Sequence, residues 1–267
     1  MIKAIALDID GTLYNSQDEI MPLTKDTLLK AHGLGITLIL VSGRSIHGLQ
    51  GLVKKHKIPL TNTILIGFNG GSIVDASNGA ILFEKDVDHD LAVKFIQSAQ
   101  AYHIVTMIPW HDTLLVEEPD DEYVQYEAQT EGMKIKVVPD LSCIDFSPSK
   151  IMFATEPKKL DQYLAQLPVT LKNEASFLKS APHYLDINSQ GLDKGIALQY
   201  FCDLKGITAS EVIAFGDNFN DMAMLEFAGV SVAMGNAVEE LKKVANYVTL
   251  SNNEDGIGCF LRKYFQL

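Results

Sequence analysis

The chain of 267 residues has only three cysteines, and their positions argue against a zinc site and against a disulfide-rich scaffold. Cys143, Cys202 and Cys259 are widely separated, and no two of them have the close spacing of zinc ligands. A disulfide-rich secreted scaffold is equally unexpected with three scattered thiols. We therefore expect reduced and mostly buried cysteines in a cytoplasmic protein.

Long apolar runs and long basic runs are also missing. No segment approaches the roughly 20 apolar residues of a membrane span, and Asp8 interrupts any signal-peptide core. Lysine and arginine form no long run, and the formal net charge is -12. Neither nucleic acid nor a membrane is therefore expected as a partner, and the sequence favours a cytoplasmic location.

Two apolar segments are each followed by acidic residues. Residues 2–8 predict a strand that ends at Asp8, and Asp10 and Gly11 follow it. Near the other end of the chain, residues 212–215 predict a strand followed by Asp217 and Asp221. Carboxylates beside a buried strand need a compensating cation or donor. Both segments therefore indicate a site at the carboxyl edge of one sheet, where open α/β sheets bind ligands.

Strands and helices alternate at both ends of the chain, which is typical of a doubly wound parallel sheet with right-handed crossovers. The 47% hydrophobic content is sufficient for a packed core. The predicted strands cover residues 2–8, 36–41, 63–66, 212–215, 230–234 and 247–250. The predicted helices cover residues 23–32, 42–57, 193–204, 219–228, 238–244 and 258–265. Residues 72–75 and 80–84 predict a hairpin after the Asn69-Gly70-Gly71 turn.

The middle of the chain has a different pattern, with shorter segments punctuated by prolines and turn residues. The predicted helices there are 90–102, 120–131 and 158–167. The predicted strands are 105–109, 113–117, 134–138, 150–155, 170–173 and 184–187. This mixture favours an α+β insert with its own core. We expect residues 1–84 and 188–267 to form one domain and residues 85–187 to form another.

Four segments place complementary polar groups at the expected sheet edge. Asp8, Asp10, Asp217 and Asp221 supply hard oxygen ligands that suit Mg²⁺. Further polar groups follow predicted strands or begin predicted helices and could bind an anion or compensate the acids: Thr12, Ser42, Gly43 and Lys194. A metal, cations for oxygens and several acids are the requirements of phosphoryl transfer.

These segments resemble the motifs of the haloacid dehalogenase superfamily of phosphatases. D-I-D-G-T at 8–12 is similar to the first motif, S-G-R at 42–44 to the second, L-D-K-G around Lys194 to the third, and G-D-N-F-N-D at 216–221 to the fourth. The insert between the second and third motifs and the stretches A-M-G-N-A at 233–237 and S-N-N-E-D-G at 251–256 resemble the Cof-type sugar-phosphate phosphatases with a C2B cap. The resemblance implies a Rossmann-like α/β core with an inserted α+β cap domain.

The resemblance also implies roles for individual residues. It makes Asp8 the nucleophile that forms an aspartyl-phosphate, and Asp10 the general acid and base. It implies Mg²⁺ held by the Asp8 carboxylate, the Asp10 carbonyl, Asp217 and, through water, Asp221. The implied phosphoryl-binding groups are Ile9 N–H, Ser42, Gly43 N–H, Lys194 and Asn220. Four weaker candidates have lesser or positioning roles: Thr12, Arg44, Asn69 and Asn218.

The implied activity is a Mg²⁺-dependent phosphatase of small phosphorylated metabolites, with sugar phosphates as the favoured class. A phosphomutase would use the same aspartyl-phosphate, and water or a second hydroxyl would be the distinguishing acceptor. A phospho-aspartate signalling module is a third hypothesis. The large insert and the acid and base at Asp10 argue against it, because such a module needs neither. No G-x-G-x-x-G occurs, which disfavours dinucleotide binding.

Overall fold

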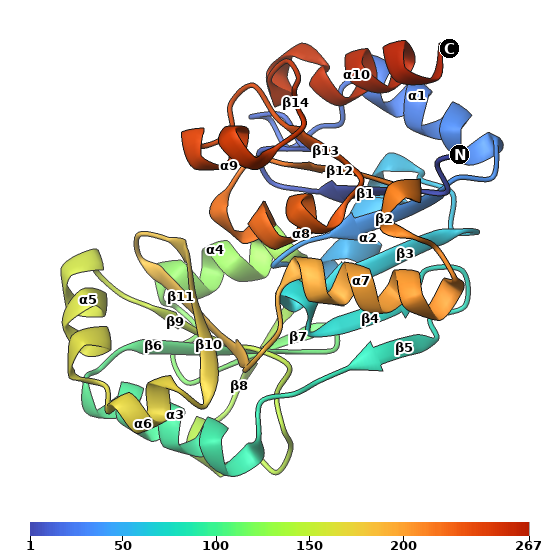
Figure 1. Cartoon of the computed structure of the whole chain (residues 1–267). Helices are drawn as coiled ribbons and strands as arrows, with labels where there is room; N and C mark the ends of the chain where they lie inside the picture. The colour runs from blue at the N-terminus through green and yellow to red at the C-terminus, as the bar shows by residue number, and fades with distance from the viewer. Residues whose placement is uncertain (267) are drawn as a thin grey trace. The chain divides into compact units, whose positions relative to one another are not determined.

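The computed structural model describes residues 1–266 (Figure 1). Contacts along the chain divide it into two compact units, each built from segments distant in sequence. The first unit comprises Met1–Ser42, Leu52–Phe83 and Asp193–Leu267, and the second comprises Gly43–Gly51 and Glu84–Leu192. The predicted domain boundaries, between residues 84 and 85 and between residues 187 and 188, stay a prediction.

An eight-stranded sheet forms the centre of the first unit, in the order β14-β13-β12-β1-β2-β3-β4-β5. The strands from β14 to β3 are parallel, and β4 is antiparallel to β3. Their bounds are β1 Ala4–Asp8, β2 Thr37–Val41, β3 Thr63–Gly67, β4 Ser72–Asp75, β5 Ile81–Glu84, β12 Val212–Gly216, β13 Val230–Ala233 and β14 Tyr247–Val248. The α/β fold class with a doubly wound parallel sheet is therefore confirmed.

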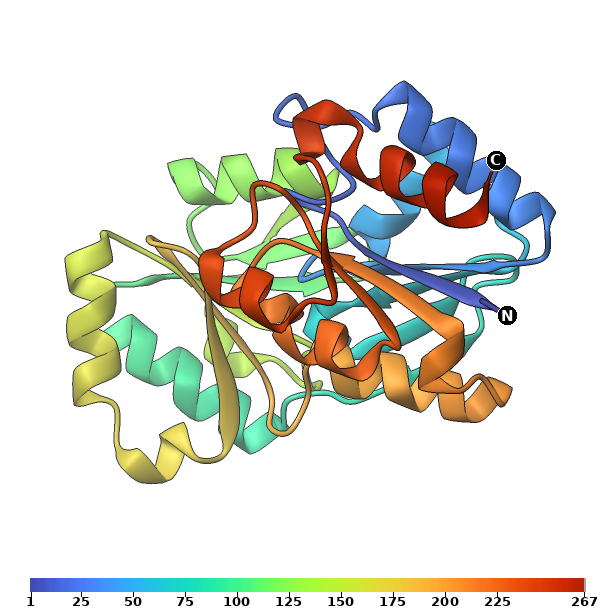
Figure 2. The same ribbon diagram turned by 45° about the horizontal axis from the view of Figure 1, so that its top comes forward.

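Helices cover both faces of this sheet. Figures 1 and 2 show α1 and α10 beside each other on one face and α7 and α8 on the other. The helix bounds are α1 Pro22–Gly33, α2 Ile46–His56, α7 Lys194–Lys205, α8 Met222–Phe227, α9 Glu239–Val244 and α10 Gly256–Phe265. Buried apolar strands between two helical layers explain the continuous apolar runs, since both faces of β1, β2 and β3 are inaccessible.

Close approach of α7 to α8 depends on Gly195 in the first turn of α7. A Cβ at Gly195 would collide with the backbone of Ala223 in α8. The predicted helix over residues 219–228 begins as a 3₁₀ turn, Phe219–Asp221, and continues as α8. Lys194 and the fourth-motif loop are therefore brought together by helix packing.

A second sheet of six strands organises the other unit, in the order β10-β11-β9-β6-β7-β8. The strand bounds are β6 Val105–Trp110, β7 Thr113–Val116, β8 Lys134–Val137, β9 Ile151–Ala154, β10 Ala175–Ala181 and β11 Tyr184–Ser189. Met107 and Ile108, adjacent on β6, belong to different apolar clusters on its two faces. Helices α3 His89–Ala101 and α5 Pro157–Gln166 contribute to one cluster, and α4 Glu122–Glu131 contributes to the other.

Two expectations for this unit and for the cysteines are wrong. The sequence predicts a strand over residues 170–173, but Val169–Lys172 form a short helix, α6, in which Lys172 N–H donates to Pro168 O at 3.0 Å. Pro168 fixes the chain at a helix start, and the strand follows as β10, paired with β11. Cys202 is buried as expected, whereas Cys143 is exposed and Cys259 is partly exposed.

Within the described residues, no helix is both long enough and apolar enough to cross a membrane.

Candidate active site

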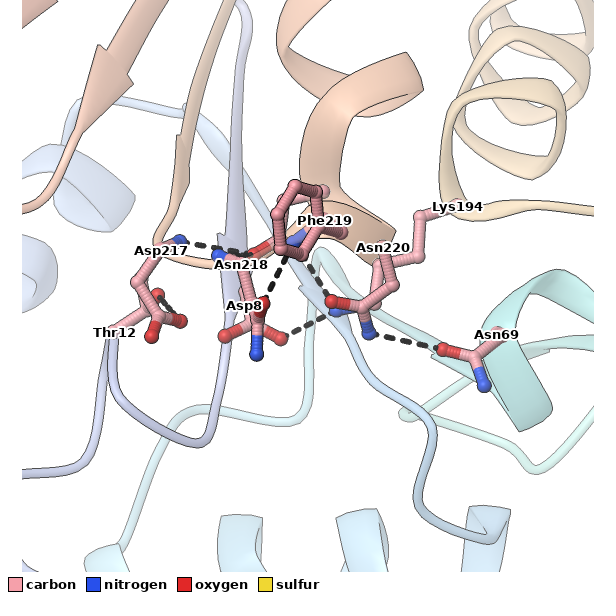
Figure 3. A network of polar contacts seen from close by, with 9 residues as sticks. Asp8, Thr12, Asn69, Lys194, Asp217, Asn218, Phe219 and Asn220 are labelled. Carbon is pink, nitrogen blue, oxygen red and sulfur yellow. Dashed lines mark hydrogen bonds and ion pairs between the residues drawn. The ribbon is translucent and has the colours of Figure 1, made fainter. Parts of the chain in front are cut away.

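Asp8 and Asp217 lie at the ends of neighbouring parallel strands. Leu7 of β1 pairs with Phe215 of β12, so the residues that follow both strands emerge at the same edge of the sheet. Figure 3 shows these carboxylates close to Lys194 and to the fourth-motif residues. The positions follow from the strand register, which the sequence pattern alone could not specify.

Three carboxylates and one ammonium form the centre of this site. Oxygens of Asp8, Asp217 and Asp221 all lie within 4.8 Å of one another. Lys194 Nζ lies 2.5 Å from Asp8 Oδ1 and 2.6 Å from Asp221 Oδ1. Lys194 begins α7, and Asp193 caps that helix by accepting the Ile196 N–H at 2.7 Å. The helix start therefore fixes the point from which the ammonium reaches the acids.

The electrostatics of the cluster favour an additional cation. Burial raises the pKa of Asp8 well above its usual value, and the Asp221 charge adds to the rise. Burial, followed by the Asp221 charge, raises the pKa of Asp217 to about 6. Burial lowers the pKa of Lys194, but the Asp221 and Asp8 charges outweigh it and raise that pKa above its usual value. One ammonium thus does not neutralise the acids.

The donor set fits a divalent metal. Carboxylate oxygens are hard ligands, and a bound divalent cation would relieve the repulsion that raises the Asp8 and Asp217 pKa values.

Asp221 makes different contacts from the other two acids. Its Oδ2 accepts the backbone N–H of Asp217 at 2.9 Å and of Asn218 at 3.0 Å, and its Oδ1 accepts from Lys194. Asp221 is therefore suited to orient the loop that carries Asp217.

The loop after β1 is fitted closely to Asp217. Gly11 has a φ of +83°, and a Cβ there would collide with the Asp217 carboxylate. Thr12 is buried and donates from Oγ1 to Asp217 Oδ1 at 3.0 Å. Asp10 is exposed in the same loop. Thr12 thus positions a proposed metal ligand.

Two asparagines that sequence reasoning did not select support this loop. Asn236 Nδ2 donates to Gly11 O at 2.8 Å, and Asn252 Nδ2 donates to Tyr14 O at 2.8 Å. Asn252 N–H also donates to Asn236 Oδ1 at 3.0 Å. Both residues lie in stretches that carry the family resemblance, A-M-G-N-A at 233–237 and S-N-N-E-D-G at 251–256, and these stretches are the sequence signal for them.

Ser42, Asn69 and Asn220 form a second connected group. Ser42 follows β2 and is buried, and its carbonyl accepts the Asn69 N–H at 2.9 Å. Asn220 Nδ2 donates to Asn69 Oδ1 at 3.2 Å, as Figure 3 shows. Asn69 has a φ of +53°, and its buried Nδ2 has no hydrogen-bond partner among the described residues. A strained backbone and an unpaired buried donor are features of ligand-binding positions.

For the other predicted site residues, the contacts lie mainly outside the three acids and Lys194. Ile9 is buried, and its carbonyl accepts the Tyr14 N–H at 2.8 Å. Asn218 is exposed and accepts the Phe219 N–H at 2.8 Å, which begins the 3₁₀ turn. Gly43 and Arg44 group with the second unit, where Arg44 Nη1 lies 3.5 Å from Thr130 O. The catalytic and binding roles of all these residues stay predictions.

Comparisons with known proteins show which family and which solved structures this chain is similar to. A family model described as haloacid dehalogenase-like hydrolase matches residues 5–261. The chain is 28% identical to the 5-amino-6-(5-phospho-D-ribitylamino)uracil phosphatase YitU of Bacillus subtilis, covering 98% of this chain and 97% of that protein. It is 26% identical to phosphatase YwpJ of the same organism, covering 98% and 99%. A crystal structure of a haloacid dehalogenase-like hydrolase from Bacteroides thetaiotaomicron is 33% identical, with a TM-score of 0.94 over 99% of this chain and 100% of that one.

Proposed function

Because this chain belongs to the haloacid dehalogenase-like hydrolase family, we propose that it is a Mg²⁺-dependent phosphatase of small phosphorylated metabolites, with sugar phosphates as the favoured class. Family membership and relatives named as phosphatases make it a phosphatase. The metal and the substrate class are the proposed part. The observation that carries the proposal is the contact of Lys194 with both Asp8 and Asp221, beside Asp217.

In the proposed first step, a carboxylate oxygen of Asp8 attacks phosphorus in line with the leaving oxygen. The Asp8 O–P bond forms as the bond from phosphorus to the leaving oxygen breaks, and Asp10 gives its proton to that oxygen. Asp8 must be ionised to attack. The Lys194 ammonium, 2.5 Å from its Oδ1, favours that form against the cost of burial.

In the proposed second step, water attacks the phosphorus of the aspartyl-phosphate, and Asp10 accepts a proton from that water. The Asp8 O–P bond breaks, and inorganic phosphate and the free carboxylate are the products. Lys194, Ser42, Asn220 and the N–H groups of Ile9 and Gly43 bind phosphoryl oxygens in both steps.

A divalent metal bound by Asp8, Asp217 and the Asp10 carbonyl would neutralise phosphoryl charge when present. Asp221 keeps the Asp217 loop in place through its two backbone hydrogen bonds. Thr12 keeps the Asp217 carboxylate oriented. These three hydrogen bonds support the assignment of Asp217 as a metal ligand, because they fix its position before a metal binds.

The decisive experiment measures phosphate release from sugar, polyol, nucleotide and cofactor phosphates, with and without Mg²⁺. We expect Mg²⁺-dependent release without any bisphosphate activator, and loss of turnover by at least about 10³-fold in Asp8→Asn with the fold retained. Asp26→Asn, which changes an exposed acid paired with Lys30, is the control and should retain activity. Undiminished turnover in Asp8→Asn would exclude the mechanism, and transfer to a second sugar hydroxyl without free phosphate would indicate a mutase.

A further inference from the structure

A buried pair of polar rings lies in the first unit beside the loop after β1. Tyr14 and His56 are each 5% exposed, and Tyr14 Oη lies 3.0 Å from His56 Nε2. The two rings meet edge to face, with their centroids 5.2 Å apart. Buried polar side chains that are hydrogen-bonded to each other make a part of the structure rigid. Neither residue has a part in the proposed mechanism, so the pair needs another explanation.

Tyr14 is the residue at which the loop after β1 is tied back to its own start. Its backbone N–H donates to Ile9 O at 2.8 Å, and it forms a β-bridge with Asp10. Its carbonyl accepts from Asn252 Nδ2 at 2.8 Å. The bridge joins the backbone of Tyr14 to that of Asp10, which is the proposed general acid and base. A shift of Tyr14 therefore moves Asp10.

His56 offers Tyr14 a partner in a fixed place. It is the last residue of α2, and Ile58 N–H donates back to Val53 O at 3.0 Å where the helix ends. Lys57, which follows His56, has a φ of +55°, so the chain turns away from the helix at that point. Val53 is buried in the core. The imidazole is thus attached to a helix end that core packing holds in place.

The segment after Tyr14 makes further contacts with the end of α2, but these are exposed. Lys55 Nζ donates to Asp18 O at 2.8 Å and lies 3.5 Å from Glu19 Oε1. It also lies 5.6 Å from the centroid of the Tyr14 ring. Exposed ion pairs contribute little to stability, because solvent screens them. The buried contact between Tyr14 and His56 is therefore the stronger constraint.

The charge state of His56 makes this contact a neutral hydrogen bond. Burial, followed by the Lys55 charge, lowers the pKa of the imidazole below its usual value, and Lys25 acts in the same direction against Glu19. At pH 7 the ring is neutral, so one nitrogen can accept a hydrogen bond from the Tyr14 hydroxyl. Two apolar side chains of the same shape would be about as stable here, because replacing both partners of a buried hydrogen bond is nearly neutral. What the polar pair adds is a defined orientation.

We propose that Tyr14 is a positioning residue for Asp10: the hydrogen bond between its hydroxyl and His56 holds the loop after β1 in the place from which the Asp10 carboxyl reaches the leaving oxygen. The inference rests on the proposed phosphatase function, in which Asp10 gives a proton to that oxygen. A general acid contributes about 10²- to 10⁴-fold to a rate, and a displacement of about 1 Å can remove much of it. The Tyr14 hydroxyl thus acts on the reaction through the Asp10 backbone.

Two esters with different leaving groups separate this role from a purely structural one. Benzyl phosphate releases an alkoxide, which needs a proton as its bond to phosphorus breaks, whereas p-nitrophenyl phosphate releases a stable phenolate that needs none. Misplacement of Asp10 therefore slows the first ester more than the second, while a loss of folded protein lowers both activities equally. The quantity to measure is the ratio of kcat/KM for benzyl phosphate to that for p-nitrophenyl phosphate, because kcat/KM reports the steps up to the aspartyl-phosphate.

The test uses the full-length enzyme loaded with Mg²⁺. In Tyr14→Phe, which removes the hydroxyl but keeps the ring, we expect this ratio to fall at least about tenfold. Tyr163→Phe is the matched control: it removes another buried tyrosine hydroxyl, 2.6 Å from Ser98 Oγ in the second unit, and should leave the ratio unchanged. An unchanged ratio in Tyr14→Phe would overturn the proposal, whether both activities fall together or neither falls.

If Tyr14→Phe does not fold, the double variant Tyr14→Phe/His56→Leu, in which neither partner is left unpaired, is measured against the same two outcomes. If the wild type hydrolyses neither ester, hydrogen exchange decides instead. The backbone N–H groups of Leu13 and Tyr14 should then exchange at least about tenfold faster in Tyr14→Phe than in the wild type, and equal exchange rates overturn the proposal. A wild type that also hydrolyses no phosphorylated metabolite makes the phosphatase proposal fail separately.

Discussion

The Lys194 ammonium contacts two buried carboxylates at once, 2.5 Å from Asp8 Oδ1 and 2.6 Å from Asp221 Oδ1. Lys194 and Asp221 are 1% and 0% exposed. Removal of one partner from such a group leaves the others buried and uncompensated, which costs more than the pair contributes in total. This relationship makes Lys194 both a structural and a functional residue, and the two effects can be separated by experiment.

Replacement of Lys194 by methionine should abolish phosphate release and lower the metal-free free energy of unfolding by about 3 kcal/mol, because three acids lose their ammonium. Mg²⁺ should restore part of this stability without restoring activity. Urea unfolding with and without Mg²⁺ measures both effects. Lys205→Met, at the exposed end of the same helix, is the control. A Lys194→Met protein with wild-type turnover would contradict the assignment.

Asn69 combines a left-handed backbone with an unpaired amide, and two variants separate these features. Asn69→Gly relieves the backbone strain and removes the amide, so stability should hold while kcat/KM falls about tenfold or more. Asn69→Ala removes the same amide but keeps the strain, so it should also lose about 1 kcal/mol of stability. Asn62→Gly is the matched control, since Asn62 has a φ of +54° and contacts Thr37 instead. Equal turnover in all three variants would remove Asn69 from the site.

Asn236 should act as a positioning residue for the loop after β1. Loss of its 2.8 Å bond to Gly11 O in Asn236→Ala loosens the backbone beside Asp10 and Asp217. We expect kcat to fall about tenfold and the concentration of Mg²⁺ needed for half-maximal activity to rise. Asn253→Ala, which removes contacts to exposed Ser16 instead, serves for comparison. Steady-state assays across Mg²⁺ concentrations measure both quantities, and identical curves for the two variants would refute this role.

Glu127 should make stability depend on pH. Burial raises its pKa from 4.5 to about 7, the Glu131 and Asp186 charges act in the same direction, and Lys150 and Arg44 oppose them. The folded protein binds this proton more tightly than the unfolded chain does. The stabilisation is therefore complete below about pH 4.5 and is lost as pH rises through about 7.

Glu127→Gln carries no titrating proton, so its stability relative to the wild type should rise between pH 5 and 8, by up to about 3 kcal/mol, since one pKa unit corresponds to about 1.4 kcal/mol. Chemical unfolding at several pH values measures the difference. Glu118→Gln, at an exposed position of the same unit, provides the baseline. A constant difference between Glu127→Gln and the wild type across this range would show that Glu127 does not titrate there.

The sequence predicted the parallel sheet because its strands are continuous apolar runs that end in turn residues and acids. It failed at residues 170–173, where the chain forms a short helix directly after Pro168 although Val169 and Thr170 favour a strand. It also overlooked β10, whose lysine and serines give a weak apolar pattern. Short segments have too few residues for periodicity to distinguish a strand from a helical turn.

The sequence by itself determined which residue types follow each strand: Asp8 and Asp10 after β1, Ser42 after β2, and Asp217 after β12. Only the tertiary structure decided that Lys194 contacts Asp8, that Asn236 donates to Gly11 O, and that Lys150 and Asp186 are buried together. The physical reason is that a motif fixes local chain geometry, whereas contacts between residues more than 30 positions apart depend on how strands register and helices pack.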